Sequence, residues 1–173
     1  MKIIDDFLPQ EDLKEIQDTM LGPDFAWYYN PSIDGLDNPP IDYREQEDKF
    51  QFVHVFYRYN RPMSNFYDEW YEKFIIPVIG NNSVMDRMKA NLLTKTPSII
   101  ENEFHVDDST KKPFTTAIFY LNSNNGYTKF KDGKKVESQE NRLIRFPVRK
   151  EHTGTSCTDK KVRVVINFLY MEI

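Results

Sequence analysis

The chain has 173 residues, of which 39% are hydrophobic and 14% aromatic, and its formal net charge is −4. This length fits one domain, residues 1–173, that buries a core without disulfide or metal staples. The sequence has no apolar run long enough to cross a membrane, no secretory-type apolar segment near its start, and one cysteine, Cys157. We therefore expect a cytoplasmic protein, and the negative charge gives no general attraction to nucleic acid.

The first half of the chain predicts a few helices and strands around a long loop. Residues 2–7 predict a short strand, and a helix is expected after Pro9 because three apolar residues follow at helical spacing: Leu13, Ile16 and Met20. Residues 24–49 are rich in Pro, Asp, Asn and Tyr and predict an irregular loop, which we expect to act as a lid over the site. Residues 51–58 predict a strand.

A second helix is expected after this strand. Ser64 is a suitable N-cap, and an apolar stripe follows it: Phe66, Trp70 and Phe74. From residue 84 onward the pattern changes to short strands separated by turns, at residues 87–94, 104–107, 114–122, 127–131, 134–136, 142–146 and 162–170. Such spacing predicts a mainly β sandwich or barrel over residues 84–173. The helices of residues 1–83 would pack on its outside.

The candidate chemistry begins with the histidines, of which the chain has three. His105 stands two residues before Asp107, and residues two apart in a strand point to the same face. A third ligand from a neighbouring strand would complete a two-histidine, one-carboxylate face, which suits non-haem Fe(II). His152, which follows a predicted strand, is the natural candidate. His54 is interpreted as a structural residue.

Arg163 adds a second feature. It lies in the last predicted strand among aliphatic residues, where a guanidinium is costly to bury without an anion. Its planar fork matches a carboxylate in bidentate geometry. A simpler explanation is a local ion pair with an acid such as Asp159. Together with the histidines and Asp107, the arginine favours a bound acidic cosubstrate.

At this point the sequence resembles the Fe(II)/2-oxoglutarate-dependent oxygenases, in particular the prolyl-4-hydroxylase-like branch. The resemblance covers residues 84–173 and rests on the order of these motifs: HVD at 105–107, TTAIFYLN at 115–122, NGYTKFKDG at 125–133, NRLIRFP at 141–147, HTG at 152–154 and the strand of Arg163. It implies a double-stranded β-helix, or jelly roll. It also implies Fe(II) bound by His105, Asp107 and His152, with 2-oxoglutarate and O2 as cosubstrates and ascorbate as an optional reductant.

The resemblance also assigns cosubstrate-binding residues. Arg163 would pair with the distal carboxylate of 2-oxoglutarate and Tyr120 would help to hold it, while Ile118 and Asn167 would line the pocket. The branch often has a tyrosine in the strand before the HVD motif. Here that strand reads MKANLLTKTP, so either Asn91 or Leu93 must face the cosubstrate; Asn91 is favoured because an amide can donate to a carboxylate.

The implied function is hydroxylation of a prolyl-type peptide, an amino acid or another small molecule, with release of succinate and CO2. Four alternatives stay open. A nucleic-acid demethylase of the same superfamily typically carries a second arginine six residues after the first, where this chain has Leu169. A cupin metalloenzyme would use an HxH-type motif, which is absent. The chain could also be a binding module without catalysis, or an interaction protein that uses its aromatic first half.

Overall fold

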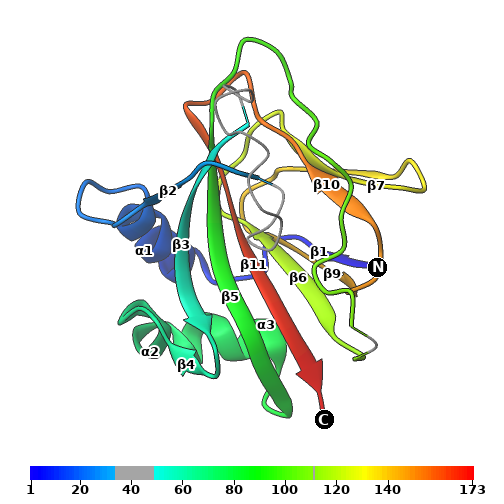
Figure 1. Cartoon of the computed structure of the whole chain (residues 1–173). Coiled ribbons are helices and arrows are strands. Elements are labelled where there is room, and N and C mark those ends of the chain that lie inside the picture. The colour runs from blue at the N-terminus through cyan, green and yellow to red at the C-terminus, as the bar shows by residue number, and fades with distance from the viewer. Residues whose placement is uncertain (34–48, 111) are drawn as a thin grey trace.

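The strands of the computed structural model, which describes residues 1–33, 49–110 and 112–173, form two antiparallel sheets (Figure 1). The larger sheet has eight strands in the order β1-β9-β6-β11-β5-β3-β2, with β4 paired to β3. The smaller sheet has three strands in the order β10-β7-β8. In Figure 1 the large sheet runs down the centre and β7 and β10 lie across its upper right. The expectation of a mainly β fold is confirmed.

The elements of the first half, in chain order, are β1 (Lys2–Ile4), α1 (Gln10–Met20), β2 (Tyr28–Asn30), β3 (Gln51–Arg58), β4 (Arg61–Pro62), α2 (Phe66–Glu69), the π-helix η1 (Tyr71–Ile75) and α3 (Ile76–Ile79). The second half consists of strands: β5 (Ser83–Thr94), β6 (Thr115–Tyr120), β7 (Tyr127–Phe130), β8 (Lys135–Glu137), β9 (Arg142–Pro147), β10 (His152–Gly154) and β11 (Val162–Glu172).

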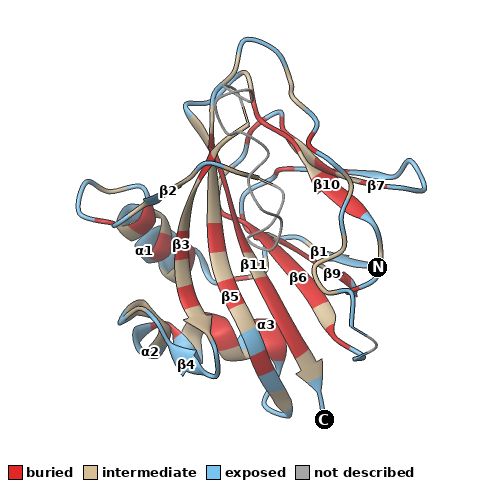
Figure 2. Cartoon of the chain, viewed as in Figure 1, coloured by how far each residue is buried: buried red, intermediate tan, exposed pale blue. Residues whose placement is uncertain are grey.

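The central strands of the large sheet bury both of their faces, as Figure 2 shows for β6 and β11. One face packs against the helices: Phe119 of β6 and Phe168 of β11 both contact Phe74. The other face meets the small sheet, where Ile118 of β6 and Val165 of β11 cluster with a second group: Tyr120, Phe130, Val136, Ile144 and Phe146. The alternation of β11 therefore directs Arg163, Val165 and Asn167 toward the space between the sheets.

Several elements differ from the sequence-based expectations. Residues 104–107 do not form a strand; His105 makes only an isolated antiparallel bridge with His152. The expected single helix after Ser64 is divided into α2, η1 and α3. Part of the expected irregular loop is a strand, because β2 pairs with β3 through Tyr28 and Val53. The greater part of the expected lid, residues 34–48, lies outside the described residues.

Among the residues that the structure describes, no helix is long and apolar enough to cross a membrane.

The His54 side chain, on β3, connects the residues before β2 with the residues before α2. Its Nδ1–H donates to the Ala26 carbonyl at 2.8 Å, and its Nε2 accepts from the Ser64 hydroxyl at 2.9 Å. The ring also packs against Phe25 and Phe56. Both nitrogens of a neutral imidazole are therefore satisfied. The interpretation of His54 as a structural residue agrees with these contacts.

This setting predicts a loss of stability in acid. Burial lowers the pKa of His54 below its ordinary value of 6.5, so the unfolded chain takes up a proton at a higher pH than the folded chain. The free energy of unfolding should fall as pH drops below about 6.5, by at most about 1.4 kcal/mol per pH unit for this group. His54→Gln should flatten the slope of unfolding free energy between about pH 7 and pH 5 without removing it, because burial also lowers the pKa of His152. An unchanged slope would contradict this prediction.

Candidate metal and cosubstrate site

Three side chains that could hold a metal converge between the two sheets. His105 and His152 come together through a pair of backbone hydrogen bonds, each N–H donating to the other residue's carbonyl at 3.0 Å. One ligand atom each from His105, Asp107 and His152 lies within 4.8 Å of the others. The Asp107 Oδ2 and His152 Nε2 atoms are 3.7 Å apart, and metal–ligand bonds of about 2.1 Å allow one ion to touch both. The segment that carries His105 and Asp107 and the strand β10, which carries His152, thus bring the expected triad together.

The carboxylate of Asp107 is held in its charged form. The Thr116 hydroxyl donates to Oδ2 at 2.7 Å, and the Arg87 guanidinium donates to Oδ1 at 3.3 Å. Burial alone would raise the pKa of Asp107, but His152, which is protonated in the acid range where Asp107 titrates, the Arg87 charge and the Thr116 hydrogen bond hold it below its usual value. A charged, oriented carboxylate is the form that a metal binds.

Both imidazoles present one nitrogen to the site. His152 Nδ1–H donates to the Lys150 carbonyl at 3.0 Å, and His105 Nδ1–H donates to the Glu103 carbonyl at 3.3 Å. These bonds favour the tautomer in which Nε2 carries the free lone pair, as in other metal-binding histidines. Burial lowers the pKa of His152, so its ring is neutral at pH 7. The donor set therefore fits a divalent transition metal.

Arg163 is enclosed on the same side of the large sheet and is only 2% exposed. Its Nε–H donates to the Ser138 hydroxyl at 2.8 Å, and Nη2 lies 3.4 Å from the Thr128 hydroxyl. Asp159 instead accepts from the Asn125 backbone, so the local ion pair does not form. No carboxylate among the described residues pairs with Arg163. A buried guanidinium of this kind indicates a site for an external anion.

Gly126 leaves the room that Arg163 needs. A Cβ atom at this position would lie 2.6 Å from the Arg163 Cδ and 2.6 Å from the Ser156 carbonyl oxygen. The glycine of the NGYT segment that follows the YLN strand is therefore required by the packing of the arginine.

Gly126→Ala should consequently displace the arginine and destabilise the fold, by about 1–3 kcal/mol as in other overpacked interiors. Gly154→Ala is the matched control, because its Cβ would meet only the Arg163 Nη1, at an ordinary 3.5 Å. The difference in unfolding free energy between the two variants checks the prediction. Equal stabilities would show that the backbone at Gly126 moves aside freely.

One pocket of about 520 Å³ joins the triad to Arg163. Its wall includes four of the residues assigned by resemblance: Asn91, Ile118, Arg163 and Asn167. Leu93 also lines it, directly opposite Arg163 in the β5–β11 register, so Asn91 and Leu93 share the inward face. The buried Asn91 Oδ1 has no hydrogen-bond partner among the described residues. A rotated amide would offer its N–H there to a ligand.

Tyr120 lies behind the wall of the pocket, and its expected contact with the cosubstrate carboxylate stays a prediction. It is fully buried between the sheets, and its hydroxyl donates to the Thr128 hydroxyl at 2.8 Å. It does not belong to the wall of the pocket, whereas Thr128 does. The Arg163 Cζ atom lies 5.8 Å from the centre of the Tyr120 ring. Tyr120 thus supports the groups around the anion site from behind.

The sequence analysis missed further residues of this pocket. Thr128, on the pocket wall, and Ser138, which follows β8 and does not line the pocket, both contact Arg163, but nothing in their sequence context distinguishes them from other polar residues. Arg87 and Lys89 could have been predicted from the sequence, because they lie four and two residues before Asn91 and therefore share the inward face of β5. Burial is the main cause that lowers the pKa of Lys89 to about 8; the charges of Arg87 and Arg58 act in the same direction and that of Asp107 opposes them.

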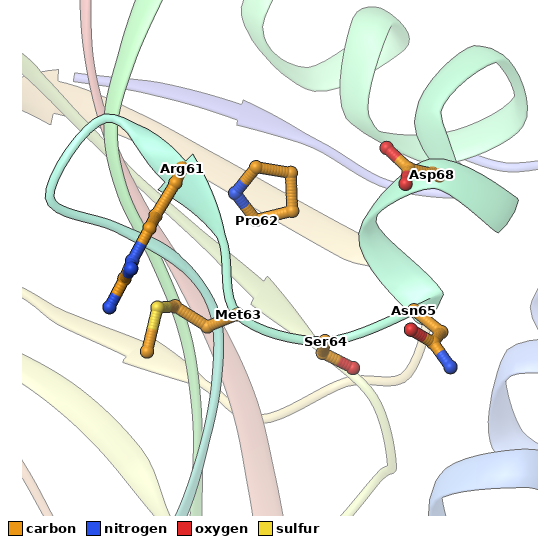
Figure 3. A pocket seen from close by; sticks show the side chains of 6 residues that line it. All are labelled: Arg61, Pro62, Met63, Ser64, Asn65 and Asp68. Atoms are coloured by element: carbon orange, nitrogen blue, oxygen red, sulfur yellow. The ribbon is translucent and has the colours of Figure 1, made fainter.

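A second hollow, of about 380 Å³, lies on the surface beside β4 and α2 (Figure 3). It is lined by Arg61, Pro62, Met63, Ser64, Asn65 and Asp68. Its Ser64 hydroxyl is engaged by His54, and Asp68 is its one acidic residue. This composition offers no metal site, so the metal chemistry is assigned to the pocket between the sheets.

Comparisons with known proteins agree on the fold. No protein-family model matches the chain, and no curated protein matches it in sequence. A 2OG-Fe(II) oxygenase family oxidoreductase from Burkholderia pseudomallei is similar in structure, with a TM-score of 0.65 at 13% identity over 97% of this chain and 83% of that one. A prolyl hydroxylase from Trichoplax adhaerens, in complex with a hypoxia inducible factor peptide fragment, gives 0.62 at 14% identity over 99% and 83%. A Pseudomonas putida prolyl-4-hydroxylase gives 0.57 at 11% identity over 97% and 90%.

The chain has the fold of the 2OG-Fe(II) oxygenases, prolyl hydroxylases among them. The expected jelly roll and the resemblance on which it rested are confirmed at the level of the fold.

Proposed function

We propose that this protein is an Fe(II)- and 2-oxoglutarate-dependent dioxygenase that hydroxylates its substrate and releases succinate and CO2. The observation that carries the proposal is the buried Arg163 guanidinium, which opens into the same pocket as the His105, Asp107 and His152 triad. A metal site alone has many uses. Here the metal site shares a pocket with a buried arginine that pairs with no carboxylate of the described residues. This combination favours an acidic cosubstrate that also binds the metal.

The chain's own residues have distinct roles in this proposal. His105, Asp107 and His152 would hold the metal, and Thr116 and Arg87 fix the orientation of the carboxylate. Arg163 would hold the distal carboxylate of 2-oxoglutarate, with Ser138 and Thr128 fixing its guanidinium. Bound Fe(II) and 2-oxoglutarate would supply the activation of O2 and the oxidising power. The protein supplies the ligand geometry and the pocket.

Peptidyl substrates of the prolyl type are supported by the structural similarity to prolyl hydroxylases, one of them in complex with a peptide. Amino acids and other small molecules are equally compatible with a pocket of about 520 Å³. The nucleic-acid demethylase alternative is disfavoured by Leu169, which is buried with Phe114 and Val148 where that branch carries a second arginine.

Succinate formation tests the proposal. Purified protein incubated with Fe(II), 2-oxoglutarate and O2 should form succinate slowly alone and faster with a substrate from a peptide and metabolite library. A binding module without catalysis would form none under either condition. Asp107→Asn provides the control, because any succinate that survives this change comes from free iron.

A further inference from the structure

The pocket contains a second group of cations, two of which, Lys89 and Arg58, have no role in the proposed function. Lys89 and Arg87 point inward from β5, and Arg58 joins them from the end of β3. In the β5–β11 register Lys89 lies opposite Asn167, whereas Arg163 lies opposite Leu93. Four residues of strand therefore separate the levels of the two cationic sites, or about 13 Å at the usual rise.

The charge of this group is not balanced by the described part of the pocket. The wall carries two carboxylates, Asp107 and Glu103. Asp107 belongs to the triad and already contacts Arg87, and Glu103 pairs with Lys49 at 3.6 Å. No described carboxylate pairs with Lys89 or Arg58. A chain with a formal charge of −4 thus places on the wall of this pocket two cations, Lys89 and Arg58, that pair with no carboxylate of the described residues.

Such a concentration of like charge is unfavourable unless an anion relieves it. Partly buried ammonium and guanidinium groups lose hydration, and their mutual repulsion adds to that cost. A bound carboxylate or phosphate would offset both the lost hydration and the repulsion, because it would form charge-assisted hydrogen bonds with these cations. The arrangement would also discriminate in favour of anionic ligands, because a neutral or cationic molecule would form no ion pair with these cations.

We propose that Lys89, with Arg58 and Arg87 beside it, is an anion subsite for the substrate that is oxidised, which is therefore an acidic molecule bearing a carboxylate or phosphate group. This inference rests on the proposed function. The cosubstrate has its own anion partner in Arg163, at the other end of the pocket. Lys89 is accordingly a specificity residue, which holds the substrate while the metal site performs the oxidation.

Binding of inorganic phosphate tests the subsite without any turnover. Metal-free protein is titrated with phosphate, and the backbone amide signals of β5 and β11 are followed by NMR. Lys89→Met should weaken the phosphate affinity read at Ala90 and Asn167 by about tenfold or more, as expected for the loss of a hydrogen bond to a charged group. Lys89→Arg should retain it, and so should Lys14→Met, a control on the exposed side of α1.

Arg163→Gln separates the two anion sites. The phosphate response around Lys89 should persist in this variant. Loss of the response in Arg163→Gln with no change in Lys89→Met would show a single anion site that belongs to the cosubstrate, and would overturn the proposal. The Kd of 2-oxoglutarate for the anaerobic Fe(II) protein supplies a second check, since Lys89→Met should leave it within about threefold if Lys89 serves the substrate.

Turnover then links the subsite to the reaction. Two matched pools of N-acetyl dipeptides are compared, one with Asp or Glu in each member and one with Asn or Gln in its place. The acidic pool should stimulate succinate formation in the parent about tenfold more than the amide pool, and Lys89→Met should remove that preference. Equal stimulation by both pools would overturn the acidic-substrate inference while sustaining the proposed function. No succinate in any assay would refute the function, and the phosphate titration would then decide the subsite alone.

Discussion

Arg163→Gln is expected to weaken 2-oxoglutarate binding by two or more orders of magnitude, because removing one partner of a buried ion pair costs about 3–5 kcal/mol. Gln retains much of the side-chain volume and can still bond to Ser138, so the change removes charge more than packing. Anaerobic titration of the Fe(II) protein with 2-oxoglutarate, followed by its absorbance, measures the affinity. Fe(II) binding itself should change little, since Arg163 contacts none of the three ligands.

Arg61→Gln is the matched control for this substitution. Arg61 lies on β4 at the surface hollow of Figure 3 and does not line the pocket between the sheets. Its replacement should leave both 2-oxoglutarate and Fe(II) affinity unchanged. Equal 2-oxoglutarate affinity in Arg163→Gln and the parent would show that another cation holds the cosubstrate, with Lys89 the next to test.

Strand alternation explains why much of the site could be predicted. In β11 the aliphatic residues Val164 and Ile166 face the helices, and the residues that alternate with them, Arg163, Val165 and Asn167, face the pocket. The same parity places Ile118 of β6 inside, opposite Asn167. A polar residue in an otherwise apolar strand is visible in sequence because burying it demands a partner. The inward face could therefore be identified before the fold was known.

The HVD segment shows where this reasoning fails. His105 and Asp107 were expected to share one face of a strand, but the backbone around them makes a single bridge, with His152. The two side chains converge because of that long-range pair and because Thr116 and Arg87 hold the carboxylate. Contacts between distant segments leave no periodic signal, so the convergence was expected for a reason that the structure does not support.

For a similar reason, the sequence could not decide whether Asn91 or Leu93 faces the cosubstrate. The two residues have the same parity, so alternation cannot separate them, and both line the pocket. Their levels are set by the register with β11, where Leu93 faces Arg163 and Asn91 faces Val165. Register follows from long-range pairing that a sequence pattern does not report. The lid expected over residues 24–49 stays a prediction, although its described part brings Asn30 and Ile33 to the pocket wall.

Asp107→Ala is expected to abolish succinate formation and to weaken Fe(II) binding by two or more orders of magnitude. The change removes the one anionic ligand of the triad and leaves the positive charge of Arg87 beside the metal position. Two imidazoles and a nearby guanidinium form a poor site for a divalent cation, whose binding depends on ligand charge. Anaerobic calorimetric titration with Fe(II), or with Mn(II) as a surrogate, measures the affinity.

Thr116→Val is the matched variant, because it keeps the carboxylate and removes only the hydroxyl that donates to Asp107. Loss of such a supporting hydrogen bond typically costs about 10–100-fold in metal affinity or activity, so this variant should fall between the parent and Asp107→Ala. Thermal unfolding tests whether Asp107→Ala changes the fold as well as the site. We expect a Tm near that of the parent, because Asp107 lies on the wall of a pocket and not in a hydrophobic cluster of the core. Parent-like metal affinity in Asp107→Ala would remove the carboxylate from the ligand set, and with it the basis for assigning iron to this pocket.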